Sequence, residues 1–254
     1  MRLDLVWREE DGARFCATVW RAGPGLRMIS SGMAGGGIGP RNWVLNAQVA
    51  SHYARMDPAA HIAELAAAYG LRGPGVGLLT AASVDRTMRR EDEGVTAAAT
   101  VGLRVPTWAA ALAGAADPEL APLTSADWRP GTINIVVEVP APLSDAALVN
   151  AVMTATEAKT QALLEAGYPC TGTASDAICV AAPIPAGDGN GGNGNGGDGA
   201  EPFAGPRSVW GARIARAVHA AVHAGALDYS AYLAGTGRRT TPVRRGGRQG
   251  QCRG

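Results

Sequence analysis

The chain has 254 residues, 46% of them hydrophobic and 18% charged, so it can bury a sizeable core, and we expect one large domain. Its formal net charge is +1, but residues 234–254 carry six arginines and no acidic residue, which leaves the rest of the chain at −5. That balance argues against nucleic acid as a partner of the folded part. Neither a signal-peptide core nor a run of about 18 apolar residues is present, which predicts a soluble cytoplasmic protein with no membrane partner.

The residue types that bind metals do not form a recognised ligand pattern. The four cysteines make no C-x-x-C pair and are interpreted as reduced thiols; they are Cys16, Cys170, Cys179 and Cys252. His219 and His223 have the i, i+4 spacing of some zinc sites, but they lie opposite Trp210 on a predicted helix, and no Glu follows His219. We therefore expect no metal and no cofactor.

Three short segments with alternating apolar residues begin the chain, at 3–8, 14–20 and 26–31, and the turns between them predict a β-meander. The third continues into a glycine-rich stretch that has neither the lysine of a Walker A loop nor the G-x-G-x-x-G spacing of a dinucleotide site. Its glycines either let backbone N–H groups approach a ligand or form a flexible loop. The candidate ligand contacts in this stretch are Ser30, Ser31, Gly35 and Gly36.

A first β-α-β unit is predicted from 43–83. Its first strand, 43–49, places Asn46 opposite the larger apolar side chains, and Asp57 followed by Pro58 is a strong helix start. The helix is expected to end at Tyr69 and to be followed by a buried strand that closes in small polar residues, beginning with Thr80. Two further candidate substrate contacts lie in the strand-to-helix loop, where a side chain either faces a cleft or is solvated; they are His52 and Tyr53.

A second β-α-β unit is predicted from 131–182. Its first strand, 132–139, alternates so that Asn134 lies on the face opposite the isoleucines and valines. Ser144 is a plausible N-cap for a helix over 145–166, and the polar turn 172–176 leads into a second buried strand. We suggest an internal duplication, in which Asn46 is equivalent to Asn134 and residues 80–83 are roughly equivalent to 173–176.

Lys159 is the most unusual residue of this second unit. It is the only lysine among 23 basic residues, and a helical wheel places it within an apolar stripe, with Glu157 at the edge of that stripe. The stripe contains Leu148, Val149, Val152, Met153, Leu163 and Leu164. A lysine in such a position needs a partner, because desolvating an unpaired ammonium costs several kcal/mol or more. Asp176 in the following turn is the nearest carboxylate in the sequence.

The remaining segments complete a fold prediction. Residues 85–93 are interpreted as an exposed connection, 95–101 as a strand and 209–224 as the last helix. We expect an α+β fold with mixed, antiparallel-rich sheets and helices on their outer faces, with an αββα sandwich from the duplicated β-α-β unit as the candidate layering. One domain is predicted over 1–233, with a flexible Gly/Asn-rich loop at 183–202 and a disordered basic tail at 234–254.

Eight segments in the same order make the chain resemble the adenosylcobinamide amidohydrolase family of corrinoid salvage. They are Ser30-Ser31 with Gly35-Gly36, Asn46 followed by Tyr53 and Asp57-Pro58, 77–82, 131–135, 144–147, 156–159, 172–176, and 203–206 before the last helix, and together they cover about residues 28–224. Two departures are visible, namely Ser175 where the family often has Thr, and the long Gly/Asn insertion after Pro183.

The resemblance implies hydrolysis of the amide that joins the aminopropanol arm to the corrin ring of adenosylcobinamide, with adenosylcobyric acid and 1-amino-2-propanol as products. A small-molecule corrinoid would be the substrate and a homo-oligomer is compatible with the sequence. We expect Lys159, Glu157 and Asp176 to lie at one site that lines a cavity large enough for a tetrapyrrole. Asp176 or Glu157 would then act as a base on water or on Thr173 as nucleophile, and Asn46 and Asn134 would donate to the oxyanion.

Three alternatives stay open. Lys159 and Asp176 are equally well interpreted as a buried ion pair that holds the helix to the strand. The whole protein is alternatively a corrinoid-binding protein without catalytic activity. A third interpretation is an acyltransferase or self-processing hydrolase with a threonine nucleophile. Such a protein should cut its own chain before that threonine, so an intact 25.9 kDa chain on a denaturing gel would count against it.

Overall fold

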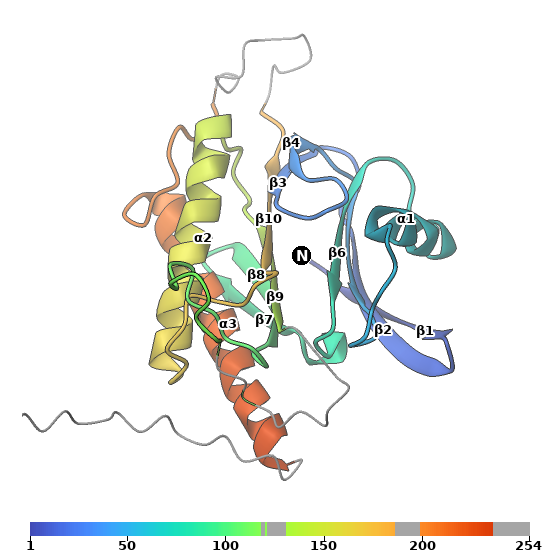
Figure 1. Ribbon diagram of the computed structural model, residues 1–254. Coiled ribbons are helices and arrows are strands. Elements are labelled where there is room, and N and C mark those ends of the chain that lie inside the picture. Colours follow the sequence, from blue (N-terminus) through green and yellow to red (C-terminus); the bar gives the residue numbers. More distant parts are fainter. Residues whose placement is uncertain (118–119, 121–130, 186–198, 236–254) are drawn as a thin grey trace, which may run out of the picture.

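The computed structural model describes residues 1–117, 120, 131–185 and 199–235. Within these residues the chain forms two β-sheets that lie face to face, with helices on both outer faces, so that four layers follow one another across the molecule (Figure 1). The predicted α+β fold and its antiparallel-rich sheets are confirmed.

The first sheet has four strands in the order β1-β2-β5-β6. Their bounds are Asp4–Glu10 for β1, Ala13–Arg21 for β2, Trp43–Gln48 for β5 and Gly75–Thr80 for β6. The parallel pair β5 and β6 is joined by helix α1, Pro58–Ala68, which covers the outer face. The predicted start of this helix is confirmed, since the Asp57 carboxylate accepts a hydrogen bond from the Ala60 N–H.

The second sheet has six strands in the order β4-β3-β10-β9-β8-β7. Their bounds are Gly37–Pro40 for β4, Leu26–Ser30 for β3, Ala177–Pro183 for β10, Thr132–Glu138 for β9, Val95–Gly102 for β8 and Met88–Asp92 for β7. The parallel pair β9 and β10 is joined by helix α2, Asp145–Glu165, and the long helix α3, Val209–Gly235, lies beside α2 on the same outer face.

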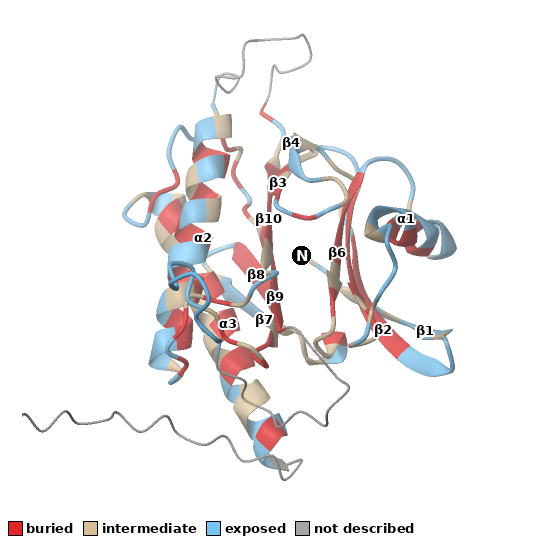
Figure 2. Cartoon of the chain, viewed as in Figure 1, coloured by how far each residue is buried: buried red, intermediate tan, exposed pale blue. Residues whose placement is uncertain are grey.

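Buried apolar side chains fill the three spaces between the four layers (Figure 2). The space between the two sheets is filled by Trp20, Met28, Val44, Val76, Leu78, Val136, Cys179 and Ala181. Towards one end of this space the inward-facing residues become polar, with Asn46, Thr100, Thr132 and Asn134 buried there. The polar end therefore lies where β5 and β6 finish and β9 begins.

Two predictions about the N-terminal half are wrong. The first three strands do not form one meander, because β3 leaves β2 and pairs with β10 and β4 in the other sheet. Residues 88–92 are not a plain connection but the edge strand β7, which pairs with β8. Edge strands are commonly short and charged, so their sequence resembles that of an exposed loop.

The buried face of α2 also differs from the predicted apolar stripe. Val149, Met153 and Leu164 are exposed, whereas Thr154 is buried and donates a hydrogen bond to the Ala204 carbonyl oxygen. The residues that the helix buries are mainly its alanines, which allow the sheet and α3 to approach closely; they are Ala147, Ala151, Ala155, Ala158 and Ala162. Leu148, Lys159 and Leu163 are buried on this face, as expected.

Helix α3 continues well beyond the predicted end near residue 224. Gly225 does not terminate it, because the missing side chain makes room for Val101 of β8; a Cβ at Gly225 would lie 2.5 Å from Val101 Cγ2. The additional turns bury Ala226 and Leu233. They carry Asp228 and Tyr229 to the polar end of the space between the sheets.

The two β-α-β units, 43–80 and 132–183, each contain a parallel strand pair as predicted. Their descent from one duplicated segment stays a prediction. The proposed equivalence of 80–83 with 173–176 is wrong, because the first segment follows β6 whereas the second precedes β10. Both segments nevertheless lie at the polar end, since the C-terminal end of β6 meets the N-terminal end of β9 there.

Candidate functional site

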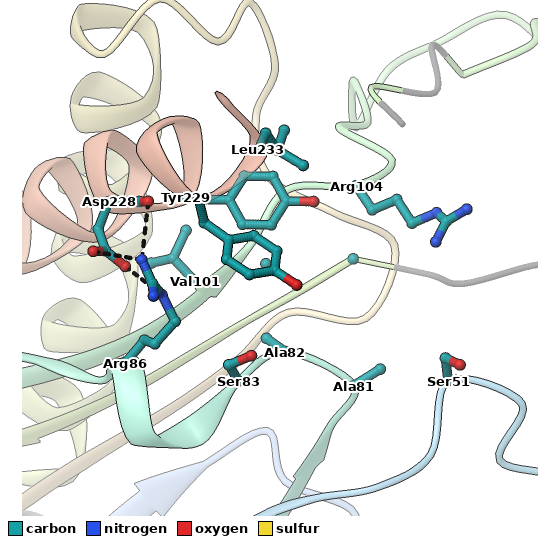
Figure 3. Close-up of a pocket in the computed structure, with 13 residues that line it drawn as sticks. Ser51, Ala81, Ala82, Ser83, Arg86, Val101, Arg104, Asp228, Tyr229 and Leu233 are labelled. Carbon is teal, nitrogen blue, oxygen red and sulfur yellow. Dashed lines mark hydrogen bonds and ion pairs between the residues drawn. The ribbon is translucent and has the colours of Figure 1, made fainter. Parts of the chain in front are cut away.

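A pocket of about 140 Å³ lies at the polar end of the molecule, between the loop after β6 and the last turns of α3 (Figure 3). Small side chains form one side of it and aromatic and charged side chains the other. The lining residues are Ser51, Ala81, Ala82, Ser83, Arg86, Val101, Gly102, Arg104, Gly131, Asp228, Tyr229, Tyr232 and Leu233. The loop after β6 is shaped by Thr80, whose hydroxyl accepts a hydrogen bond from the Ala82 N–H.

An ion pair fixes one end of this pocket. The Arg86 guanidinium donates to both carboxylate oxygens of Asp228, with Nε to Oδ2 and Nη2 to Oδ1 each at 2.8 Å. The guanidinium also lies over the ring of Tyr232, 5.2 Å from its centroid. Because a bidentate pair holds both partners in one geometry, it joins the short 3₁₀ helix Val84–Arg86 to α3 and keeps the pocket wall in place.

A second polar cluster is centred on Asp176. The predicted pairing is confirmed, because the buried Lys159 Nζ lies 2.5 Å from Asp176 Oδ2. The hydroxyl of Thr173 donates to the other carboxylate oxygen, Oδ1, over 2.5 Å. The backbone N–H groups of Ile133 and Thr173 donate to Oδ1 and Oδ2 at 2.9 and 3.1 Å.

These contacts determine what the carboxylate can do. A carboxylate has about four acceptor positions, and four donors already occupy those of Asp176. A water molecule therefore has no acceptor position left on it, whereas the Thr173 hydroxyl proton already points at Oδ1. Gly172 lets the cluster close, since it adopts a φ of +152° and a Cβ there would lie 2.1 Å from Asp176 Oδ2 and 2.5 Å from Lys159 Nζ.

Only a thin wall separates the Asp176 cluster from the pocket. Gly131 lines the pocket, and a Cβ built on it would lie 3.1 Å from the Thr173 methyl group. The Ser175 hydroxyl donates to the Gly131 carbonyl oxygen on the same side. Lys159 and Asp176 are themselves not among the lining residues, and the pocket is smaller than the roughly 300–1,000 Å³ that encloses a whole small ligand. That Lys159 lines a cavity for a whole tetrapyrrole stays a prediction.

The two asparagines meet in a buried chain of hydrogen bonds between the sheets. Asn134 Nδ2 donates to Asn46 Oδ1 at 2.8 Å and to the Leu79 carbonyl oxygen, while Asn46 Nδ2 donates to the Thr100 hydroxyl. Both hydrogens of Asn134 Nδ2 are thus used, and the group without a protein partner is its buried Oδ1. In this arrangement Asn134 offers an acceptor, contrary to the predicted role as an oxyanion donor.

Glu157 is not brought to the Asp176 cluster. Its side chain is exposed on the outer surface of α2, in a hollow shared with Arg216 and His219 of α3. The predicted meeting of Glu157 with Lys159 and Asp176 is wrong, because a helix turns by about 100° per residue. Positions two apart therefore point to different sides of α2.

The loop after β5 divides its side chains between two places. Ser51 lines the pocket, whereas His52 and Tyr53 line a separate hollow beside Glu10. The Tyr53 hydroxyl lies 3.1 Å from Nδ1 of the buried His61, whose Nε2 lies 3.3 Å from Glu10 Oε1. Burial lowers the pKa of His61, against the opposing effect of the Glu10 carboxylate.

The glycine-rich segment packs against protein rather than against the pocket. The hydroxyls of Ser30 and Ser31 accept hydrogen bonds from the N–H groups of Gly32 and Ile178. A Cβ at Gly35 would lie 1.9 Å from the carbonyl oxygen of Gly75, at the beginning of β6, and one at Gly36 would lie 2.6 Å from that of Gly32. The pocket lies at the other end of β6. A role of these four residues in binding substrate stays a prediction.

The described cysteines are buried and unpaired, and burial raises the pKa of each thiol, that of Cys179 to about 12. A thiolate nucleophile is therefore not favoured among them; Cys252 lies outside the described residues.

Among the residues that the structure describes, no group of three or more metal-binding side chains is present, and no helix has the length and apolar character needed to span a membrane. His219 contacts Glu165 and stacks on His223.

Sequence reasoning missed most of the pocket lining. Ser51, Arg86, Arg104, Asp228 and Tyr229 belong to no recognised motif. One signal was present, because Val222, Ala226 and Leu233 continue the helical spacing of apolar residues past Gly225. Following that spacing would have extended α3 and placed Asp228 and Tyr229 near the end of the sheets.

Comparisons with known proteins give a consistent result. A family model described as adenosylcobinamide amidohydrolase matches residues 3–234. A protein of Methanosarcina mazei named adenosylcobinamide amidohydrolase is 33% identical over 197 residues, which cover 78% of this chain and 88% of that relative. A protein of Halobacterium salinarum with the same name is 36% identical over 164 residues, which cover 63% of this chain and 68% of that relative.

Proposed function

This chain belongs to the adenosylcobinamide amidohydrolase family, and from that premise we propose that it hydrolyses the amide between the corrin ring and the aminopropanol arm of adenosylcobinamide. The products would be adenosylcobyric acid and 1-amino-2-propanol, so that an incomplete corrinoid returns to cobalamin synthesis. The match of the family model to nearly the whole chain is the observation that carries this proposal.

The Asp176 cluster supports a threonine nucleophile for this reaction. Nucleophilic catalysis needs a hydroxyl within hydrogen-bond reach of a base, and a third group that orients the base. Thr173 Oγ1 lies 2.5 Å from Asp176 Oδ1, while Lys159 and the Ile133 N–H hold the carboxylate from the other directions. Since no acceptor position on Asp176 is left for water, Thr173 is the better candidate for the attacking group.

The proposed steps balance without a metal or a cofactor. Thr173 Oγ attacks the amide carbon while its proton passes to Asp176, and the C–N bond then breaks as the departing amine takes up that proton. The resulting ester places Thr173 Oγ out of hydrogen bonding with Asp176, so water can take its place at Oδ1. Attack by this water on the ester releases the carboxylic acid and restores the threonine.

The test is incubation of the purified protein with adenosylcobinamide, followed by mass spectrometry of the corrinoid. We expect adenosylcobyric acid from the wild type and from Thr173→Ser, a loss of turnover of at least 10²-fold in Thr173→Val, and unchanged turnover in Thr156→Val, a control on the exposed surface of α2.

Other outcomes would favour the alternatives. Corrinoid that is bound but recovered unchanged would indicate a binding protein without catalytic activity. Cleavage of the chain before Thr173, in place of an intact 25.9 kDa protein, would indicate a self-processing hydrolase. Full turnover in Thr173→Val would remove Thr173 as the nucleophile and leave the family assignment intact.

A further inference from the structure

The size of the pocket beside Gly131 limits what it can hold. Its volume of about 140 Å³ is too small for a corrin ring and suits a short side arm. The amide of the proposed substrate has a large group on one side, the ring, and a small one on the other, the amino-alcohol. Only the smaller of these groups can enter the pocket as it stands.

The lining of the pocket matches the chemistry of such an arm. Ala82 and Val101 contribute apolar surface to the lining, and Ser83 and Tyr229 contribute hydroxyls (Figure 3). A short amino-alcohol has the same mixture, with a methyl group, a hydroxyl and an amide N–H. The Arg86 guanidinium at the end of the pocket is neutralised by Asp228, so the pair presents polar edges and no net charge.

The position of the pocket relative to Thr173 is also suitable. The Thr173 methyl group packs against Gly131, and Gly131 forms part of the pocket wall. An arm that occupies the pocket would therefore place its amide near the end where Thr173 and Asp176 lie. The ring would remain outside the pocket.

We propose that this pocket binds the amino-alcohol arm of the substrate and that Ala82, Gly102 and Tyr232 determine which arms are accepted. This inference rests on the proposed function, because it assigns one subsite of that reaction. Ala82 and Gly102 both line the pocket and face each other, since a Cβ on Gly102 would lie only 2.8 Å from the Ala82 Cβ, so a larger side chain at position 82 reduces the space. Tyr232 lies under the Arg86 guanidinium at the end that the ion pair fixes and is 43% exposed, so its truncation lengthens the pocket at that end.

The experiment compares three corrinoid amides that differ only at the scissile position, namely the 2-hydroxypropyl amide, a longer hydroxyalkyl amide and the unsubstituted primary amide. We expect Ala82→Leu to lower kcat/KM for the hydroxypropyl amide by on the order of tenfold or more and to leave the primary amide, which has no arm, within about twofold. Tyr232→Ala should raise kcat/KM for the longer arm relative to the hydroxypropyl arm by a similar factor.

Ala67→Leu on the exposed side of α1 is the matched control, since it adds the same atoms away from the pocket and should change none of these ratios. Thermal unfolding of each variant shows whether the fold is retained; if Ala82→Leu does not fold, the Tyr232→Ala ratio decides. An equal loss for all three amides in Ala82→Leu, or an unchanged arm preference in Tyr232→Ala, would overturn the arm subsite. Failure of the proposed function is a separate result, because the wild type would then release no amine from any of the three amides.

Discussion

The two β-α-β units each bury one basic side chain of their helix against a carboxylate, but the two pairs differ in chemistry. In the second unit, Lys159 of α2 meets Asp176 in the turn of its own unit, at 2.5 Å and with every acceptor position of the carboxylate occupied. In the first unit, His61 of α1 reaches outside its unit to Glu10 of β1, at 3.3 Å.

The difference between the two pairs follows from the chemistry of the buried side chain, which is an ammonium in Lys159 and an imidazole in His61. Lys159 is buried and has the Asp176 carboxylate as its counter-charge, and the pair ties three segments together, namely α2, the turn before β10 and the start of β9. An imidazole can lose its charge instead, and burial favours this in His61. The Lys159 pair therefore joins three segments of the second unit, whereas burial lowers the pKa of the His61 imidazole in the first unit.

Removal of the Lys159 charge is expected to have the largest effect on stability, and it tests whether the Lys159–Asp176 pair holds the second unit together. We expect Lys159→Met to lower the free energy of unfolding by about 3–5 kcal/mol, because it leaves the buried Asp176 carboxylate without its counter-charge. Chemical denaturation measures this change. Gln161→Met on the exposed side of the same helix is the control, and it should cost less than about 0.5 kcal/mol.

Turnover measured on the same samples separates the two interpretations of the pair. A pair that acts only as a brace predicts that Lys159→Met is destabilised and that its folded fraction retains substantial turnover. The orienting role of Lys159 in the proposed reaction predicts that turnover is lost as well. Lost turnover with an unchanged free energy of unfolding would mean that Lys159 acts in the reaction and would contradict its role as a brace.

Gly172→Ala tests how far stability depends on the geometry of the Lys159–Asp176 pair, because it disturbs the contact and removes neither charge. The added Cβ would lie 2.1 Å from Asp176 Oδ2 at a φ of +152°, so the pair must move apart and the backbone is strained. We expect a loss of about 2–3 kcal/mol. Gly167→Ala is the matched control, since it also has a positive φ but no atom within 4 Å, and it should cost only about 1 kcal/mol. Equal losses in the two variants would show that the contact with the ion pair contributes nothing.

The sequence predicted the Lys159 pair because a buried charge strongly restricts its surroundings. One lysine on a mainly buried helix needed a carboxylate, and the turn before β10 contained Asp176. The strand pairs were predictable for a similar reason, since alternation over 132–138 leaves one orientation for Asn134. Strong local constraints of this kind can be predicted from the amino-acid sequence alone.

The pocket could not be predicted in the same way. Ala81, Ala82 and Gly102 line it by being small, and small residues occur throughout this chain, which contains 35 glycines. Its other side depends on α3 continuing past Gly225, which is set by packing against Val101 of a distant strand. The burial of His61 was missed for a related reason, because its partner Glu10 lies in a hairpin that the α1 sequence does not specify.

The pH dependence of stability gives the smallest expected effect and concerns the first unit alone. The pKa of His61 is lowered in the folded protein, with burial as the main cause, so near and below its ordinary value of about 6.5 the unfolded chain binds more protons than the folded one. The contribution of His61 to stability is therefore fully present above about pH 6.5 and is lost as the pH falls towards the lowered pKa, with a slope of at most about 1.4 kcal/mol per pH unit. Replacing the buried imidazole in His61→Gln should flatten the dependence of the free energy of unfolding on pH below about pH 6.5. Ala67→Leu, on the exposed side of the same helix, adds no titratable group and should leave that dependence unchanged. A slope that survives in His61→Gln would show that groups other than His61 cause it, and the contrast with Lys159 and Asp176 would lose its support.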